Sequence, residues 1–139
     1  MPFAKYVIAI AASLLLLASS SCRKGGCQVF QTVPFQYIAS YTQYGSLSVP
    51  GGYAETEQGG VSGLIIVHTA NGIRAYDRRS TVNPEQGCRV NVEEGGQTAI
   101  DPCSQARYVL TNGAPASVAE CPLREYSVSY QQNGVLISN

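Results

Sequence analysis

The sequence predicts an all-β protein with antiparallel sheets, and three observations support this class. Outside the N-terminal segment, no window shows the sustained period of 3.6 residues that an amphipathic helix needs. Short stretches rich in β-branched and aromatic residues alternate between apolar and polar instead. Asn-Gly pairs at 71–72, 112–113 and 133–134 provide the strongest short hairpin signal, and strands joined by such tight turns run antiparallel.

The expected strands begin after residue 28. VFQTVPFQYI (29–38) is the first, and Pro34 restricts it to a sheet edge or a bulge because proline has no N–H to donate. GLIIVHT (63–69) is apolar enough to be buried on both faces. The Asn-Gly turn at 71–72 then leads into a partner strand at 73–77.

Further strands are expected in the C-terminal half, after a polar, irregular stretch at 78–86. Residues 88–93 alternate as a strand, and EEGG turns the chain back into 97–100. Residues 125–130 alternate again, and QQNG returns the chain into a last strand at 135–138. We therefore expect one β domain over residues 28–139, a size that suits a single domain.

The N-terminal 21 residues have the layout of a secretory signal rather than of a domain. Lys5 precedes an apolar run at 6–18, which is shorter than the roughly 20 residues that span a bilayer. Small residues follow and end at Cys22, so the segment resembles the lipoprotein signal of bacteria. That family prefers an aliphatic residue three places before the cysteine, where this chain has Ser19.

This resemblance implies cleavage before Cys22, lipidation of Cys22 and a short tether at 22–27. The alternative is an ordinary secretory signal that is cut nearby and leaves Cys22 as a plain thiol. We expect a membrane-anchored lipoprotein of the bacterial cell envelope, facing the periplasm or the exterior. Without Lys5 the mature chain would carry eight basic and nine acidic residues, with no basic patch, so we expect no nucleic-acid partner.

Four further cysteines remain once Cys22 is set aside: Cys27, Cys88, Cys103 and Cys121. An even number in an exported chain favours disulfides. No CxxC pair exists, which disfavours a zinc ribbon or knuckle. Free buried thiols and a metal site stay open as alternatives at this point.

The segment DPCSQARYVLTNGAPASVAECPLREYSV (101–128) resembles the second ligand loop of Rieske iron–sulfur domains, which typically reads CPCHGSxFDLxTGxPxxGPAxxPLxxYxV. The matched residues are Pro102, Cys103, Tyr108, Thr111, Gly113, Pro115, Pro122, Leu123, Tyr126 and Val128. Upstream, GLIIVHTANGIRAYDRRSTVNPEQ (63–86) is similar to the segment that enters the first ligand loop, usually AxDxxCPH. The resemblance covers about 63–138 and implies an antiparallel β-sandwich of the Rieske type.

On this alignment all four cluster-ligand positions are changed. Ser80 and Val82 take the places of the first cysteine and histidine, and Asp101 and Ser104 take those of the second pair. A Rieske centre needs two imidazoles on one iron, whereas the only histidine here is His68, inside the expected strand 63–69. We therefore expect no cofactor; the alternative is an electron-transfer protein that binds a [2Fe-2S] cluster or another metal.

The resemblance also implies a disulfide pairing, because some Rieske proteins join a non-ligand cysteine of the second loop to one near the first loop. Here that pair is Cys88 and Cys103, which leaves Cys27 to pair with Cys121. Together these features predict a non-enzymatic binding or structural module, attached to the membrane through lipid, with an envelope protein as a candidate partner.

Overall fold

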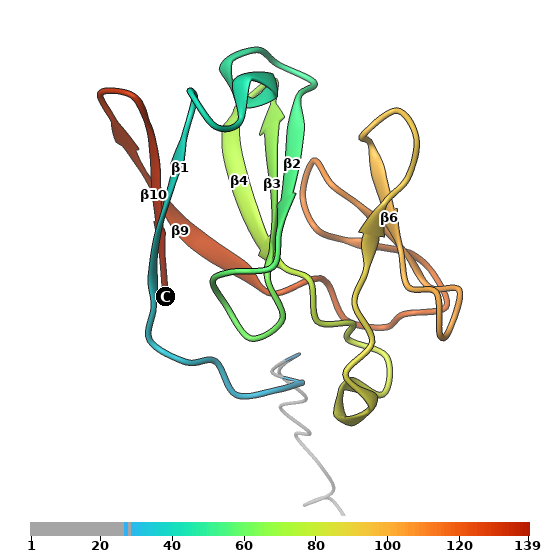
Figure 1. Cartoon of the computed structure of the whole chain (residues 1–139). Helices are drawn as coiled ribbons and strands as arrows, with labels where there is room; N and C mark the ends of the chain where they lie inside the picture. The colour runs from blue at the N-terminus through green and yellow to red at the C-terminus, as the bar shows by residue number, and fades with distance from the viewer. Residues whose placement is uncertain (1–26, 28) are drawn as a thin grey trace, which may run out of the picture.

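The structure is a computed structural model that describes Cys27 and residues 29–139 (Figure 1). The expected signal segment, the lipidation site Cys22 and most of the expected tether lie outside the described residues. Within the described part of the chain, no helix has the length and apolar character needed to cross a membrane.

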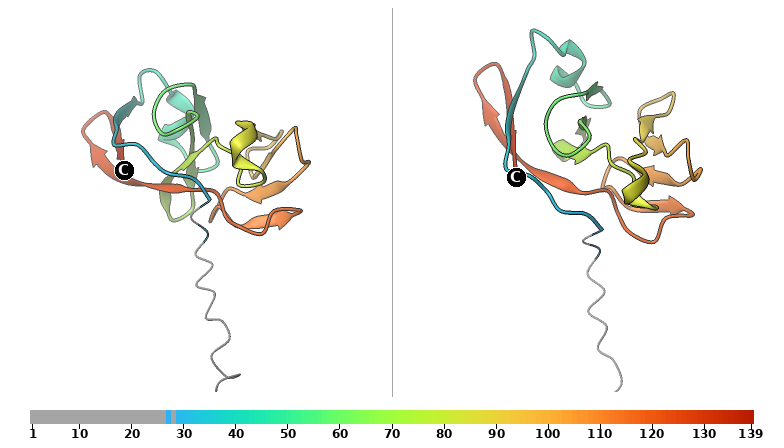
Figure 2. Two further views of the ribbon diagram at one scale, coloured as in Figure 1. Left: turned by 90° about the horizontal axis from the view of Figure 1, so that it is seen from below. Right: turned by 60° about the horizontal axis from the view of Figure 1, so that its bottom comes forward.

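The larger of two sheets has six antiparallel strands in the order β1-β10-β9-β4-β3-β2. Its strands are β1 (Gln36–Ser40), β2 (Tyr53–Thr56), β3 (Leu64–Thr69), β4 (Gly72–Asp77), β9 (Glu125–Gln131) and β10 (Gly134–Ser138). β9 pairs with β4 only near its start, through Ala75 with Tyr126 and Tyr76 with Glu125. The sheet therefore curls over at β9, and β1-β10-β9 face β2-β3-β4 (Figures 1 and 2).

The smaller sheet has four antiparallel strands in the order β5-β6-β7-β8. These are β5 (Asn91–Val92), β6 (Thr98–Ile100), β7 (Arg107–Val109) and β8 (Pro115–Ser117). Two short 3-10 helices complete the described elements, η2 (Gly45–Ser48) and η3 (Pro84–Gln86). The predicted all-β, antiparallel class is confirmed.

β3 lies in the middle of three layers, and its side chains alternate between two cores. Leu64 and Ile66 belong to the core between the two halves of the curled sheet, which includes Val135 and Ile137 of β10. The intervening Ile65 and Val67 face the smaller sheet, in a core completed by Val90, Ala99, Tyr108 and Leu110. The prediction that 63–69 is buried on both faces is therefore confirmed.

Two predicted strands differ in extent from the observed ones. The first strand begins only after Pro34, at Gln36, and it is an edge strand as the proline predicted. The strand expected at 88–93 is shortened to Asn91–Val92 because its first residues pair elsewhere. Val90 donates its N–H to the carbonyl of Arg78, and the carbonyl of Cys88 accepts one from Ser80, so this stretch lines the first loop before it joins β6.

Asp77 at the end of β4 fixes three segments at once. Its fully buried carboxylate accepts hydrogen bonds from the N–H groups of Val61 at 2.6 Å, Ser62 at 3.2 Å and Arg79 at 2.7 Å. The Tyr126 hydroxyl donates a fourth at 2.7 Å. Burial, followed by the contact with Asp77, raises the pKa of Tyr126 well above its ordinary value. The β2–β3 loop, β9 and the start of the first loop therefore converge on one carboxylate.

We expect Asp77→Asn to lower the free energy of unfolding by about 3 kcal/mol. The amide of asparagine has one oxygen and cannot accept all four hydrogen bonds, so at least one of the buried donors around residue 77 is left without an acceptor. Urea unfolding followed by circular dichroism measures this loss. Glu125→Gln is the matched control: its ion pair with Arg74 is exposed, so its removal costs under about 1 kcal/mol. Equal losses in the two variants would contradict the role assigned to Asp77.

Candidate functional site

Two loops meet at one end of the smaller sheet, and they contain the four positions aligned with cluster ligands. The first loop, residues 78–88, leaves β4 and contains η3. The second loop, residues 101–106, joins β6 to β7. Figure 1 places both loops toward the end of the molecule at which the described chain begins.

The carboxylate of Asp101 joins three of the four positions into one hydrogen-bonded cluster. Ser80 of the first loop donates its hydroxyl to Asp101 Oδ2 at 2.6 Å, and Ser104 of the second loop donates to the same oxygen at 2.5 Å. The N–H of Cys103 donates to Oδ1 at 2.8 Å. Asp101 and Ser80 are fully buried, so the bond between them is shielded from water.

The local sequence explains how Asp101 comes to point inward. Asp-Pro favours the start of a turn, and the Asp101 side chain closes it by accepting the N–H two residues on. The backbone then returns: the Asp101 N–H donates to the carbonyl of Ala106, and Gln105 donates to the carbonyl of Asp101. Gln105 adopts a left-handed backbone with φ of 65°, which completes the tight loop.

The electrostatics of Asp101 favour its ionised form. Burial acts to raise the pKa of the carboxyl group, but the hydroxyls of Ser104 and Ser80 and the backbone N–H groups of Cys103 and Ser104 outweigh it. The net effect lowers the pKa of Asp101 below its ordinary value. The group is therefore a poor candidate for a general acid, since it stays ionised around neutral pH.

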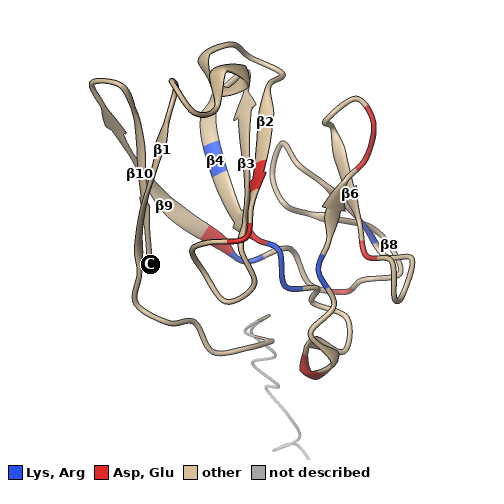
Figure 3. Cartoon of the chain, viewed as in Figure 1, with Lys and Arg blue, Asp and Glu red and all other residues tan. Residues whose placement is uncertain are grey.

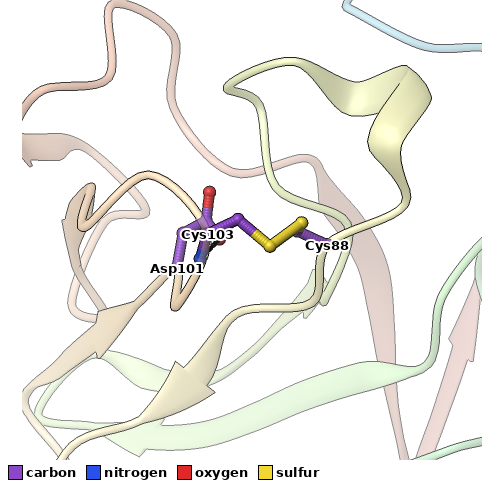
Figure 4. Close-up of side chains that lie close together, drawn as sticks. All are labelled: Cys88, Asp101 and Cys103. Atoms are coloured by element: carbon purple, nitrogen blue, oxygen red, sulfur yellow. Dashed lines mark hydrogen bonds between the residues drawn. A yellow bond between two sulfur atoms is a disulfide. The ribbon is translucent and has the colours of Figure 1, made fainter.

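A disulfide between Cys88 and Cys103 crosses from one loop to the other beside this cluster (Figure 4). Their Cα atoms are 6.3 Å apart, and this is the pair that the resemblance implied. The two sulfurs and a carboxylate oxygen of Asp101 all lie within 4.8 Å of one another. Because the sulfurs are bonded together, neither is a thiolate, the form in which cysteine ligates a metal.

The fourth aligned position, Val82, offers no donor atom. Its side chain is half-buried and packs against the second core, while its N–H donates to the Ser80 hydroxyl at 3.2 Å. Its neighbour Thr81 makes the polar contacts instead. The Thr81 hydroxyl hydrogen-bonds the Tyr108 hydroxyl at 2.8 Å and donates to the carbonyl of Cys121 at 2.9 Å, so it links the first loop to β7 and the last loop.

Sequence reasoning missed Thr81 as a site residue and favoured a solvated loop for Arg78, since a polar stretch without periodicity gives no sign of burial. Arg78 is buried, and its guanidinium donates to Glu57 at 2.8 Å and to the Asn91 side chain at 2.7 Å. Glu57 also pairs with Arg89. Charges of both signs therefore alternate where β4 enters the first loop, and they neutralise one another (Figure 3).

The second disulfide joins Cys27 to Cys121, with Cα atoms 5.3 Å apart. It holds the start of the described chain against the last loop, which connects β8 to β9. Cys27 belongs to the segment expected to be a tether, so that segment is covalently fixed at its last residue. This is the second pair that the resemblance implied.

His68 lies away from both loops. It is the next-to-last residue of β3, and its Nδ1 donates to the carbonyl of Leu47 in η2 at 2.8 Å. The donor set at the aligned positions is therefore two hydroxyls, one carboxylate and one alkyl group. This set does not match the two thiolates and two imidazoles of a Rieske centre.

No protein-family model matches the chain, and no curated protein matches it either. Solved structures with a similar fold include the plasma membrane Rieske protein of Synechocystis PCC 6803, which is 23% identical with a TM-score of 0.48. That match covers 63% of this chain and 84% of the other.

Two ferredoxins match the fold with the same TM-score and lower sequence identity. The ferredoxin of carbazole 1,9a-dioxygenase from Nocardioides aromaticivorans IC177 is 15% identical with a TM-score of 0.48, over 76% of this chain and 96% of that one. The Sphingomonas yanoikuyae B1 ferredoxin is 14% identical with a TM-score of 0.48, over 68% and 93%.

We expect Asp101→Asn to lower the free energy of unfolding at pH 7 by about 1.5–3 kcal/mol, the value of hydrogen bonds to a charged group. Because the folded pKa lies below the ordinary value, the carboxylate stabilises the fold above about pH 3.9, and this contribution is lost as the pH falls toward the folded pKa. Urea unfolding at pH 7 and pH 3 should therefore show a smaller difference at pH 3. Glu94→Gln, at an exposed turn residue, is the control.

Replacing both Cys88 and Cys103 with serine should lower the free energy of unfolding by about 3 kcal/mol, the chain-entropy value for a loop of this length. Thermal unfolding of the double variant, with Cys27 and Cys121 intact, measures the loss. Peptide mapping without reductant should recover the 88–103 pair from the unmodified protein. Free thiols at both positions would contradict the pairing.

Proposed function

We propose that this chain is a lipid-anchored protein of the bacterial cell envelope whose Rieske-like domain holds no iron–sulfur cluster. The domain serves as a binding or structural module and not as an enzyme. The observation that carries this proposal is the Asp101 cluster, in which the aligned ligand positions bond to one another.

The chemistry of the aligned positions supports a domain without a cluster. The Ser80 and Ser104 hydroxyls both donate hydrogen bonds to Asp101, and with the N–H of Cys103 its two oxygens accept three such bonds. Iron held at this place would have to displace that network and would find no imidazole, because the only histidine is bonded to Leu47. Hydroxyl groups do not replace thiolate and imidazole as ligands of this cluster.

The cross-links support a second part of the proposal, that the two loops keep their arrangement without a metal. In place of a cluster, the Cys88–Cys103 disulfide and the Ser80–Asp101 hydrogen bond span the loops. Two disulfides also suit an exported chain, since such bonds persist in oxidising compartments. The anchor itself rests on the sequence around Cys22.

A metal-binding electron-transfer protein is the second candidate, and one observation favours it. Cys88, Cys103 and Asp101 place three ligand atoms within 4.8 Å of one another. The disulfide and the hydrogen bonds on Asp101 weigh against this candidate, because both would have to break before all three atoms bound a metal.

Purified protein from a bacterial envelope distinguishes the two candidates. We expect no visible absorption above the protein band at 280 nm, and iron well below one atom per chain, because the aligned positions supply no pair of imidazoles. The Cys88→Ser, Cys103→Ser double variant should be equally colourless. A brown protein with two irons per chain would overturn the proposal in favour of electron transfer.

The same preparation tests the anchor. Mass spectrometry of the N-terminal peptide should show Cys22 as the first residue, carrying acyl chains. The acylated wild-type chain should fractionate with membranes. Cys22→Ser should release it into the soluble fraction. An unacylated N-terminus at another residue would refute the anchor while leaving the question of the cluster unaffected.

A further inference from the structure

The end of the domain that holds the two loops is also the end at which the chain enters. The Cys27–Cys121 disulfide fixes the first described residue against the last loop. Only four residues, 23–26, separate Cys27 from Cys22 in the sequence. Five residue steps of at most about 3.6 Å give a reach of roughly 18 Å, so a lipid on Cys22 would keep this end close to the bilayer surface.

A shallow hollow with a mixed lining opens at this end, and its polar part comes from Thr81, Asn83, Glu120 and Cys121. It lies between the first loop, the last loop and the segment after Cys27, and three valines from these three segments line it: Val29, Val82 and Val118. Val118 is 64% exposed, whereas the other two are half-buried. Apolar side chains of three separate segments therefore gather beside the point where the anchor would attach.

The backbone at Val118 holds this side chain outward in an unfavourable conformation. Its φ is 66°, and the N–H of Ala119 donates to the carbonyl of Ser117 across it, which forms a tight turn of a rare and strained kind. A β-branched residue at positive φ is a genuine outlier. Such outliers gather at functional positions, where the surrounding structure maintains them.

The charges near the hollow do not select for anionic lipid. Glu120 lines it and Glu85 of η3 is exposed nearby in the first loop, while Arg124 is exposed just beyond Cys121. Arg23 and Lys24 of the sequence precede Cys27. With both signs present, an apolar contact is the one that the described residues favour.

We propose that this end of the domain rests on the lipid bilayer, with Val118 inserted among the headgroups and the two former ligand loops facing the membrane. The inference rests on the lipid anchor proposed at Cys22. The opposite end, which contains η2, then faces away from the membrane (Figure 1).

The absence of tryptophan from the chain allows a direct test. Val118→Trp introduces a single reporter, and Val49→Trp is its matched control. Val49 is also a valine, is 56% exposed and follows η2 at the opposite end. Both variants are prepared as the full acylated chain in phosphatidylcholine vesicles, with or without bromine on the acyl chains, and acylation is verified by mass.

We expect brominated lipid to lower the emission of Val118→Trp about twofold, because an apolar side chain that binds a membrane surface is buried about 5–10 Å into the boundary between headgroups and acyl chains, where it meets the bromine. The emission of Val49→Trp should not change, and high salt should not alter either result. If Val118→Trp fails to fold, Ala116→Trp at an exposed position of the neighbouring strand gives the same readout.

Equal emission from Val118→Trp with and without bromine, on acylated protein, would overturn this inference and leave the anchor standing. An emission shifted to the blue without quenching would place protein, such as a second copy of the chain, over Val118 and would overturn it too. An unacylated product would refute the anchor itself, and this inference with it.

Discussion

The hydrogen bond between Ser80 and Asp101 is the contact on which the loop end of this protein depends. It is buried, it joins residues 21 apart in the sequence, and it connects the loop after β4 to the loop after β6. Metal ligation is one way to hold two such loops together, and an ionised carboxylate with converging donors is another. The second way needs no imported group, because all of its parts are encoded in the chain.

Asp77 and Asp101 are two buried carboxylates that connect loops in the same way. Each follows or ends a strand, each is fully buried, and each is surrounded by donors from more than one segment. Burying a carboxylate is costly unless hydrogen bonds replace the lost water. Within the described residues, no buried side-chain nitrogen or oxygen lacks a partner, so this condition is met throughout. The two carboxylates thus order loops that have little apolar surface of their own.

Local signals predicted the hairpins well, but they did not predict how the loops close. The Asn-Gly turns and the apolar run of β3 were recognisable because they depend on neighbouring residues. β2, Tyr53–Thr56, was missed because its sequence YAET is short and carries a central glutamate. The alignment identified Ser80, Asp101 and Ser104 as a set, yet their mutual bonds depend on the long-range approach of two loops, which no local pattern contains.

The Cys27–Cys121 bond gives the domain a mechanical property. β1 is an edge strand that bonds only to β10, so tension applied at the N-terminus would peel it away one residue at a time. The covalent link instead passes such tension directly to the chain just before β9, and residues 28–40 are bypassed. Tension applied at Cys27 would therefore reach the larger sheet at β9, a strand in its middle, and the edge strand β1 would carry none of it.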